Sequence, residues 1–184
     1  MQRRGWLIAV AGGVIGLSAV FAHSVYGADR PHPAAPRPLA AQTGGLLSQP
    51  VLPLAVALQA ATAAQEACVQ QGYRVSVAIV GRDGQVQVHL RGDGSGPHTL
   101  ASSERKAYTS ASLGQPTAAL DANSRNPGGQ GVREIPGLLL LAGGLPIRAG
   151  DAVIAGIGVG GAPGGDLDAG CAQAGIDAIA GQLQ

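Results

Sequence analysis

The sequence predicts an α+β domain in which an antiparallel sheet of five strands is flanked by helices, in the order α-β-β-α-α-β-β-β-α. Three observations lead to this prediction. Alternating apolar residues on both sides of Asp83-Gly84 indicate a β-hairpin. Three short apolar runs near the C-terminus indicate a three-stranded meander, and Ala-rich segments at both ends of the domain have the spacing of helices.

The first helix and the hairpin are expected in the first third of the domain. Apolar residues recur at near-helical spacing between positions 54 and 68, Pro53 suits a first helical turn, and Gly72 suits a C-terminal stop. The hairpin follows, because residues alternate from Val75 to Ile79, turn at "RDGQ", and alternate again from Val86 to His89.

The other elements follow in chain order. The stretch "GPHTLASSERKAYTSAS", residues 96–112, is expected to form a helix beginning around Thr99, and a short helix is expected near Thr117. An irregular loop covers "NPGGQGVREIPG", and the meander is expected in "LLLLAGGLPIRAGDAVIAGIGVGG". The last helix is expected to begin near Asp166, because acidic residues favour a helix N-terminus.

The N-terminal part of the chain resembles an export signal followed by a tether. Arg3 and Arg4 precede an apolar run and a small-residue site at Gly27, so residues 1–27 are interpreted as a signal peptide. An uncleaved anchor is the alternative, which the glycines within the run disfavour. Residues 28–50 form a Pro/Ala-rich flexible leader, and residues 51–184 form the folded domain. We expect a periplasmic or secreted protein without stable membrane insertion after cleavage, exported by either the Sec or the twin-arginine route.

Charge and cysteine content narrow the functional classes. Without residues 1–27 the chain carries ten Lys and Arg against eleven Asp and Glu, a net charge of −1, which excludes nucleic acid as a partner. The only two cysteines, Cys68 and Cys171, lie in the exported part, so we predict a disulfide between the first and last helices. The many small residues bury little apolar area, and we therefore expect a homo-oligomer.

Two motifs that suggest enzyme chemistry have simpler explanations. "GIGVGG" matches the GxGxxG pattern of nucleotide-binding proteins, but it lies near the end of the chain and has the alternation of a strand packed closely on one face. Ser102 and Ser103 lie near His98, yet their position favours hydrogen bonds at a helix start rather than a catalytic triad. No residue is therefore assigned a catalytic role.

The residues that remain as ligand candidates lie in the stretch 96–112. His98 stands on a loop at the helix start, where it can supply one axial bond to a haem or, less readily, a corrinoid. The alternative is an ordinary loop histidine. His89, on the second hairpin strand, is expected to face solvent.

Four segments together resemble the GlcG/HbpS family of haem-binding or haem-degrading proteins. These are "VAIVGRDGQVQVHLRGDG", "SSERKAYTSAS", "IPGLLLLAGGLPIRAGDAVIAGIGVGG" and "DLDAGCAQAGIDAI". The resemblance covers roughly residues 54–180, and "RKAYT" and "GGLPIRAGD…GIGVGG" carry most of it. It implies a profilin-like fold, higher oligomers, and haem as the partner.

The resemblance also implies where haem would bind. Its best-known secreted member ligates iron through a threonine, which Thr109 matches, so His98 and Thr109 are both candidate iron ligands. Arg105 and Lys106 are candidate partners of the haem propionates. Tyr108, which lies between them and Thr109 in the sequence, is a further candidate haem contact. We therefore expect an exported haem-binding protein that scavenges, buffers or senses haem or iron, with the haem near the N-terminal end of the helix and close to a subunit boundary. A haem-degrading or small-metabolite enzyme and a cofactor-free accessory module are the alternatives.

Overall fold

The computed structural model describes residues 48–184. The expected signal peptide, residues 1–27, and most of the expected leader, residues 28–50, lie outside this part of the chain. Within residues 48–184, no helix is long and apolar enough to cross a membrane.

The helices and strands agree with the α+β prediction, except that one strand is missing. The order is α1 (Leu54–Gln70), β1 (Ser76–Gly81), β2 (Val86–Arg91), α2 (His98–Leu113), α3 (Thr117–Ser124), η1 (Gln130–Glu134), β3 (Gly144–Ala149), β4 (Ala152–Gly160), α4 (Gly165–Asp177) and η2 (Ala180–Gln182), where η denotes a 3-10 helix. The sheet therefore has four strands rather than the five that were expected.

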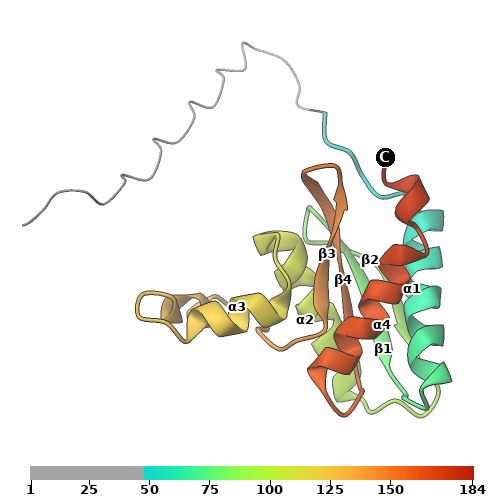
Figure 1. The fold of residues 1–184 in the computed structure, drawn as a ribbon, viewed down its shortest axis with the longest axis horizontal. Coiled ribbons are helices and arrows are strands. Elements are labelled where there is room, and N and C mark those ends of the chain that lie inside the picture. The colour runs from blue at the N-terminus through green and yellow to red at the C-terminus, as the bar shows by residue number, and fades with distance from the viewer. Residues whose placement is uncertain (1–47) are drawn as a thin grey trace, which may run out of the picture. The chain divides into compact units, whose positions relative to one another are not determined.

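The four strands form an antiparallel sheet between helices on both faces. Their spatial order is β2-β1-β4-β3, and every neighbouring pair is antiparallel. Helices α1 and α4 cover one face, and α2 lies across the other face (Figure 1). The chain between α2 and β3, which contains α3 and η1, extends away from the sheet as an arm (Figure 1).

The predicted fifth strand is wrong, because the run 138–141 is bound to a helix instead of the sheet. The Leu139 amide donates a hydrogen bond to Thr109 Oγ1 at 2.9 Å. Leu138 and Leu140 are buried in a small apolar cluster with Leu120 of α3. This segment therefore closes the base of the arm rather than adding a strand.

The "GIGVGG" segment lies in β4, where its glycines allow α2 to rest directly on the sheet. A Cβ atom built on Gly158 would lie 2.1 Å from the Ser103 carbonyl oxygen, and one on Gly156 would lie 2.2 Å from the Ala107 carbonyl oxygen. Both distances are far inside van der Waals contact, so no side chain fits at either glycine. This agrees with the interpretation of the motif as close packing.

On the opposite face, α1 and α4 are joined by the predicted disulfide. Cys68 Sγ and Cys171 Sγ are bonded at 2.09 Å, and both residues are fully buried. The two helices approach closely through small residues, since a Cβ built on Gly175 would lie 2.5 Å from the Ala60 carbonyl oxygen. Small side chains thus set the spacing of the layers on both faces of the sheet.

Candidate functional site

Helix α2 carries the stretch that the sequence singled out, and its two ends are fixed locally. At its start, Thr99 Oγ1 donates to the Gly96 carbonyl oxygen at 2.7 Å and shares a second hydrogen bond with Ser76 Oγ of β1, also at 2.7 Å. At its end, Gly114 has a φ of 66°, the left-handed conformation that commonly terminates helices.

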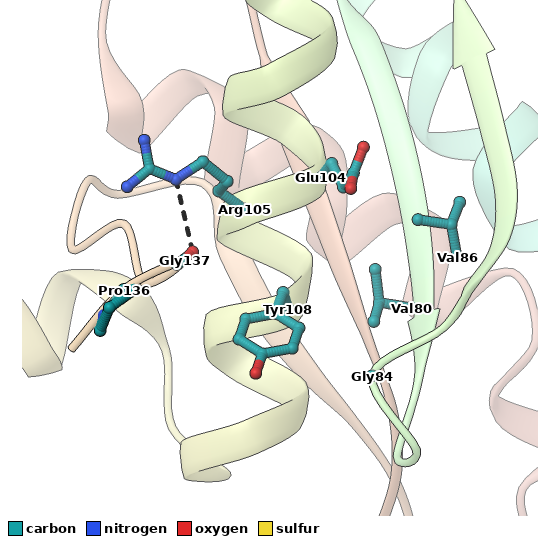
Figure 2. A pocket seen from close by; sticks show the side chains of 8 residues that line it. All are labelled: Val80, Gly84, Val86, Glu104, Arg105, Tyr108, Pro136 and Gly137. Carbon is teal, nitrogen blue, oxygen red and sulfur yellow. Dashed lines mark hydrogen bonds between the residues drawn. The ribbon is translucent and has the colours of Figure 1, made fainter.

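A cavity of about 250 Å³ opens beside the middle of α2. One wall is the β1–β2 hairpin, and the facing wall is the loop that leads out of the arm (Figure 2). Its lining residues are Val80, Gly84, Val86, Glu104, Arg105, Tyr108, Pro136 and Gly137. The cavity thus combines apolar surface with one cationic, one anionic and one phenolic side chain.

Tyr108 spans the space between the two walls. A Cβ on Gly84 would lie 3.1 Å from the ring atom Cε2, and a Cβ on Gly137 would lie 3.6 Å from Cε1, so the ring is flanked by backbone on both edges. Gly84 has a φ of 81°, which strongly favours glycine at this hairpin turn. The Tyr108 hydroxyl makes no hydrogen bond to any residue in the range 48–184 that the structure describes.

Arg105 connects α2 to the loop that forms the facing wall of the cavity. Its Nη2 donates to the Leu138 carbonyl oxygen at 2.8 Å, and its Nε makes a longer contact of 3.4 Å with the Gly137 carbonyl oxygen (Figure 2). The side chain is exposed along the cavity. A guanidinium has five donor hydrogens, so it retains donors for an anionic ligand.

Lys106, a predicted partner of a haem propionate, lies inside the molecule and is paired there. Its side chain is 1% exposed, and Nζ lies 2.8 Å from Asp168 Oδ2 of α4 and 2.8 Å from the Val159 carbonyl oxygen. Asp168 Oδ1 also accepts a hydrogen bond from the Ala162 amide at 3.0 Å. Lys106 therefore connects α2 to β4 and α4 inside the molecule and is not available to a propionate.

The structure also gives Thr109 a different role. It is fully buried, and its hydroxyl donates to the Arg105 carbonyl oxygen at 2.7 Å while accepting the Leu139 amide. The donor hydrogen and one of the two acceptor lone pairs of the hydroxyl are thus used within the protein. In this arrangement Thr109 holds the cavity wall in place and does not line the cavity.

His98 does not lie at the cavity either. It is the first residue of α2, is exposed, and folds its ring over Gly96, where a Cβ would lie 2.7 Å from Cε1. Seven residues separate it from Arg105, which corresponds to about 10 Å along a helix. An iron bound by His98 would therefore lie at the end of α2 rather than in this cavity.

His89 is half-buried against α2 instead of facing solvent. Its Nε2 lies 3.2 Å from Ser103 Oγ, and its Nδ1 lies 3.8 Å from Glu104 Oε2. The order Ser–His–Glu resembles a catalytic triad, but Ser103 is fully buried and its hydroxyl donates to the Leu100 carbonyl oxygen at 3.0 Å. A nucleophile must reach its substrate, so we interpret this group as a packing contact between β2 and α2.

The arm carries an ion-pair network of its own. Asp121 of α3 pairs with Arg125 at 2.8 Å and with Arg133 of η1. The hydrogen bond from Arg125, followed by that from Arg133, holds the pKa of Asp121 below its usual value. The network ties η1 to α3 just before the chain reaches Pro136 and Gly137.

Sequence reasoning missed the residues that form the two walls. Val80, Val86 and Pro136 are ordinary strand and loop residues, and nothing in their local pattern distinguishes them. Tyr108 and Arg105 were among the predicted contacts and do line the cavity. In residues 48–184, no three His, Cys, Asp or Glu side chains cluster as metal ligands.

Comparisons with known proteins identify the family of the chain. Residues 52–177 match the family described as "Haem degrading protein HbpS-like". The chain belongs to this family. A search of curated proteins finds no match.

Solved structures of the HbpS-like fold include several similar proteins. The chain is 46% identical to a double mutant of Streptomyces reticuli HbpS, with a TM-score of 0.70 over 78% of this chain and 97% of that one. It is 27% identical to the Klebsiella pneumoniae protein ORFY, with a TM-score of 0.67 over 74% and 98% of the two chains. PduOC in complex with haem is 25% identical, with a TM-score of 0.64 over 70% and 95%. This HbpS-like chain thus shares its fold with several solved proteins, one of which, PduOC, was solved in complex with haem.

Proposed function

We propose that this protein is an exported, oligomeric haem-binding protein that scavenges, buffers or senses haem, and that the cavity beside α2 holds the haem. The observation that carries the proposal is the cavity itself, which presents a guanidinium, a phenol and apolar walls on the helix that the resemblance singles out. The solved haem complex of PduOC, a protein of the same fold, supports the choice of ligand.

The residues of the cavity fit one edge of a haem rather than the whole group. Val80, Val86 and Pro136 supply apolar surface for the macrocycle, and Arg105 supplies donors for a propionate. A volume of about 250 Å³ is below the range of roughly 300–1,000 Å³ that is usual for ligand pockets. The rest of the macrocycle would therefore project from the cavity mouth.

A projecting macrocycle agrees with the proposal of an oligomer, in which a second subunit would cover it. Apolar side chains exposed on the first turns of α1 support self-association separately, since Leu54 is 61% and Leu58 48% exposed. Light scattering of the mature domain tests this part, and a stable monomer at micromolar concentration, with or without haem, contradicts it.

Titration with hemin tests the proposed function. We expect saturable binding with a shifted Soret band, and we expect Arg105→Ala to weaken binding about tenfold, the usual effect of losing one charge-assisted hydrogen bond. Arg74→Ala is the matched control, because Arg74 is also an exposed arginine but lines a separate hollow of about 440 Å³. Wild-type protein that leaves the hemin spectrum unchanged contradicts haem binding. If Arg105→Ala and Arg74→Ala weaken hemin binding equally, the haem does not bind in the cavity beside α2.

Haem degradation is the second candidate, because the family to which the chain belongs is described as haem-degrading. Its test is incubation of the haem-loaded protein with ascorbate in air. Loss of the Soret band with release of iron supports an enzyme, whereas a stable band supports binding alone.

A further inference from the structure

We propose that the separate hollow at the end of α1 binds a small zwitterion of the α-amino acid class. The hollow has a volume of about 440 Å³ and is formed by the last turns of α1, the segment that leads into β1, and the loop between β2 and α2. It shares no lining residue with the cavity beside α2. The inference therefore goes beyond the proposed function and does not depend on haem.

One wall of the hollow is fixed by the way in which α1 ends, at the end of the sheet where β1 begins (Figure 1). Gly72 has a φ of 82°, and its amide donates to the Val69 carbonyl oxygen at 2.8 Å. The Tyr73 amide donates to the Cys68 carbonyl oxygen at 3.0 Å, which closes the helix. Tyr73 is half-buried and packs against the core. This wall is thus in place before a ligand arrives, which lowers the entropy cost of binding.

Two opposite charges line the hollow from different segments. Arg74 precedes β1, and Asp93 follows β2. Both residues are exposed, and neither forms an ion pair within residues 48–184. The side chain of Arg74 lies along Gly94, where a Cβ would be 3.0 Å from Nη1 and 3.1 Å from Cδ. The absence of a side chain at Gly94, whose φ is 72°, therefore leaves room for the guanidinium against the loop that carries Asp93.

This pair of charges selects the class of ligand. A simple anion would be attracted by Arg74 but repelled by Asp93, and a simple amine would meet the reverse. A zwitterion satisfies both, because its carboxylate accepts hydrogen bonds from the guanidinium and its ammonium group donates to the Asp93 carboxylate. Val69, which is 59% exposed, and Tyr73 add apolar surface for an aliphatic side chain. The volume lies within the range of roughly 300–1,000 Å³ that is usual for ligand pockets.

The experiment compares three probes with the same aliphatic body on the mature chain, residues 28–184. The probes are L-leucine, 4-methylpentanoate, which lacks the ammonium group, and 3-methylbutylamine, which lacks the carboxylate. Backbone amide shifts in NMR titrations measure both affinity and location. We expect L-leucine to bind with a Kd on the order of 1 mM and to shift the amides of Gly72 and Asp93. Each analogue should bind about fivefold more weakly, since it loses one charge contact.

Two neutral variants assign the charges to the two ends of the ligand. Arg74→Gln should remove the preference for L-leucine over 3-methylbutylamine, because the carboxylate then has no cationic partner. Asp93→Asn should remove the preference for L-leucine over 4-methylpentanoate. The matched controls are Arg125→Gln, at the end of α3, and Asp151→Asn, in the turn between β3 and β4, since both residues are exposed and distant in sequence from the hollow. Both controls should keep both preferences, and circular dichroism checks that all variants fold.

Three results would overturn the inference. The first is an absence of amide shifts around the hollow at about 10 mM L-leucine, ten times the expected Kd. The second is equal binding of the three probes, or equal losses in the variants and their controls. The third is tighter binding of D-glucose than of L-leucine, which would assign the hollow to neutral polar ligands. Hemin titration is independent of all three, so a protein that binds L-leucine but no hemin contradicts the proposed function and supports this inference.

Discussion

The buried ion pair between Lys106 and Asp168 allows a test of whether Lys106 stabilises the fold or contacts the ligand. Replacing Lys106 by Met keeps most of the aliphatic side chain but removes the ammonium group. Asp168 then keeps the Ala162 amide as its partner but loses its counter-charge, while only 3% of the residue is exposed to water. The Val159 carbonyl oxygen loses a donor at the same time.

The magnitude follows from the burial of the pair. Removing one partner of a buried ion pair typically costs about 3–5 kcal/mol, because the remaining charge is desolvated without compensation. For a domain of this size each kcal/mol lowers Tm by roughly 3–5 °C, so Lys106→Met should lower it by roughly 10–20 °C. The double variant Lys106→Met, Asp168→Leu removes both charges and should recover most of this loss.

Differential scanning calorimetry of the three proteins measures the stability, and hemin titration at a temperature where all are folded measures the ligand role. We expect the hemin affinity of Lys106→Met to equal that of the wild type. A variant that keeps the wild-type Tm but binds hemin tenfold more weakly would refute the reasoning, since Lys106 would then contact the ligand instead of Asp168.

Three further predictions concern the rest of the molecule. Gly158→Ala should destabilise the domain by about 1–3 kcal/mol or more, because its methyl group overlaps the backbone of α2; an unchanged urea midpoint contradicts this packing. Replacing Cys68 and Cys171 together by Ala should cost about 4–5 kcal/mol in the chain-entropy description of a loop of this length, measured by urea unfolding, and a loss below 1 kcal/mol contradicts it. The pKa of Asp121 is lowered in the folded state, so its ion pairs stabilise the fold above the unfolded pKa of about 4, and this stabilisation is lost as the pH falls through the folded pKa. Asp121→Asn should therefore lower Tm at pH 7 and have a smaller effect on Tm at about pH 3.

The sheet and most helices could be predicted because their patterns are local. The hairpin at Asp83-Gly84 and the helix within residues 96–112 depend on residues that are neighbours in the sequence. The run 138–141 was predicted wrongly for the opposite reason. An apolar run of four residues is compatible with a strand, and only the distant hydroxyl of Thr109 determines that it binds α2 instead.

The side chains of the candidate site were harder to predict from the sequence than the strands. In the segment "SSERKAYT", Arg105 and Lys106 are adjacent and have the same charge, so the sequence gives no reason to separate them. In the fold they point in different directions, because consecutive residues of a helix lie about 100° apart around its axis. Lys106 reaches a carboxylate that lies 62 residues further along the chain, and Arg105 remains at the surface.

The disulfide also determines what a protease can do to this protein. Cys68 and Cys171 are 103 positions apart, so the covalent ring that they close contains all four strands and both walls of the cavity. The exposed arm, with η1 at Gln130–Glu134, lies within this ring. One cut in the arm opens the ring but releases no fragment, because both pieces remain joined through sulfur. Outside the cell, where proteases are common and disulfides persist, a nicked molecule would still migrate as one chain until it is reduced.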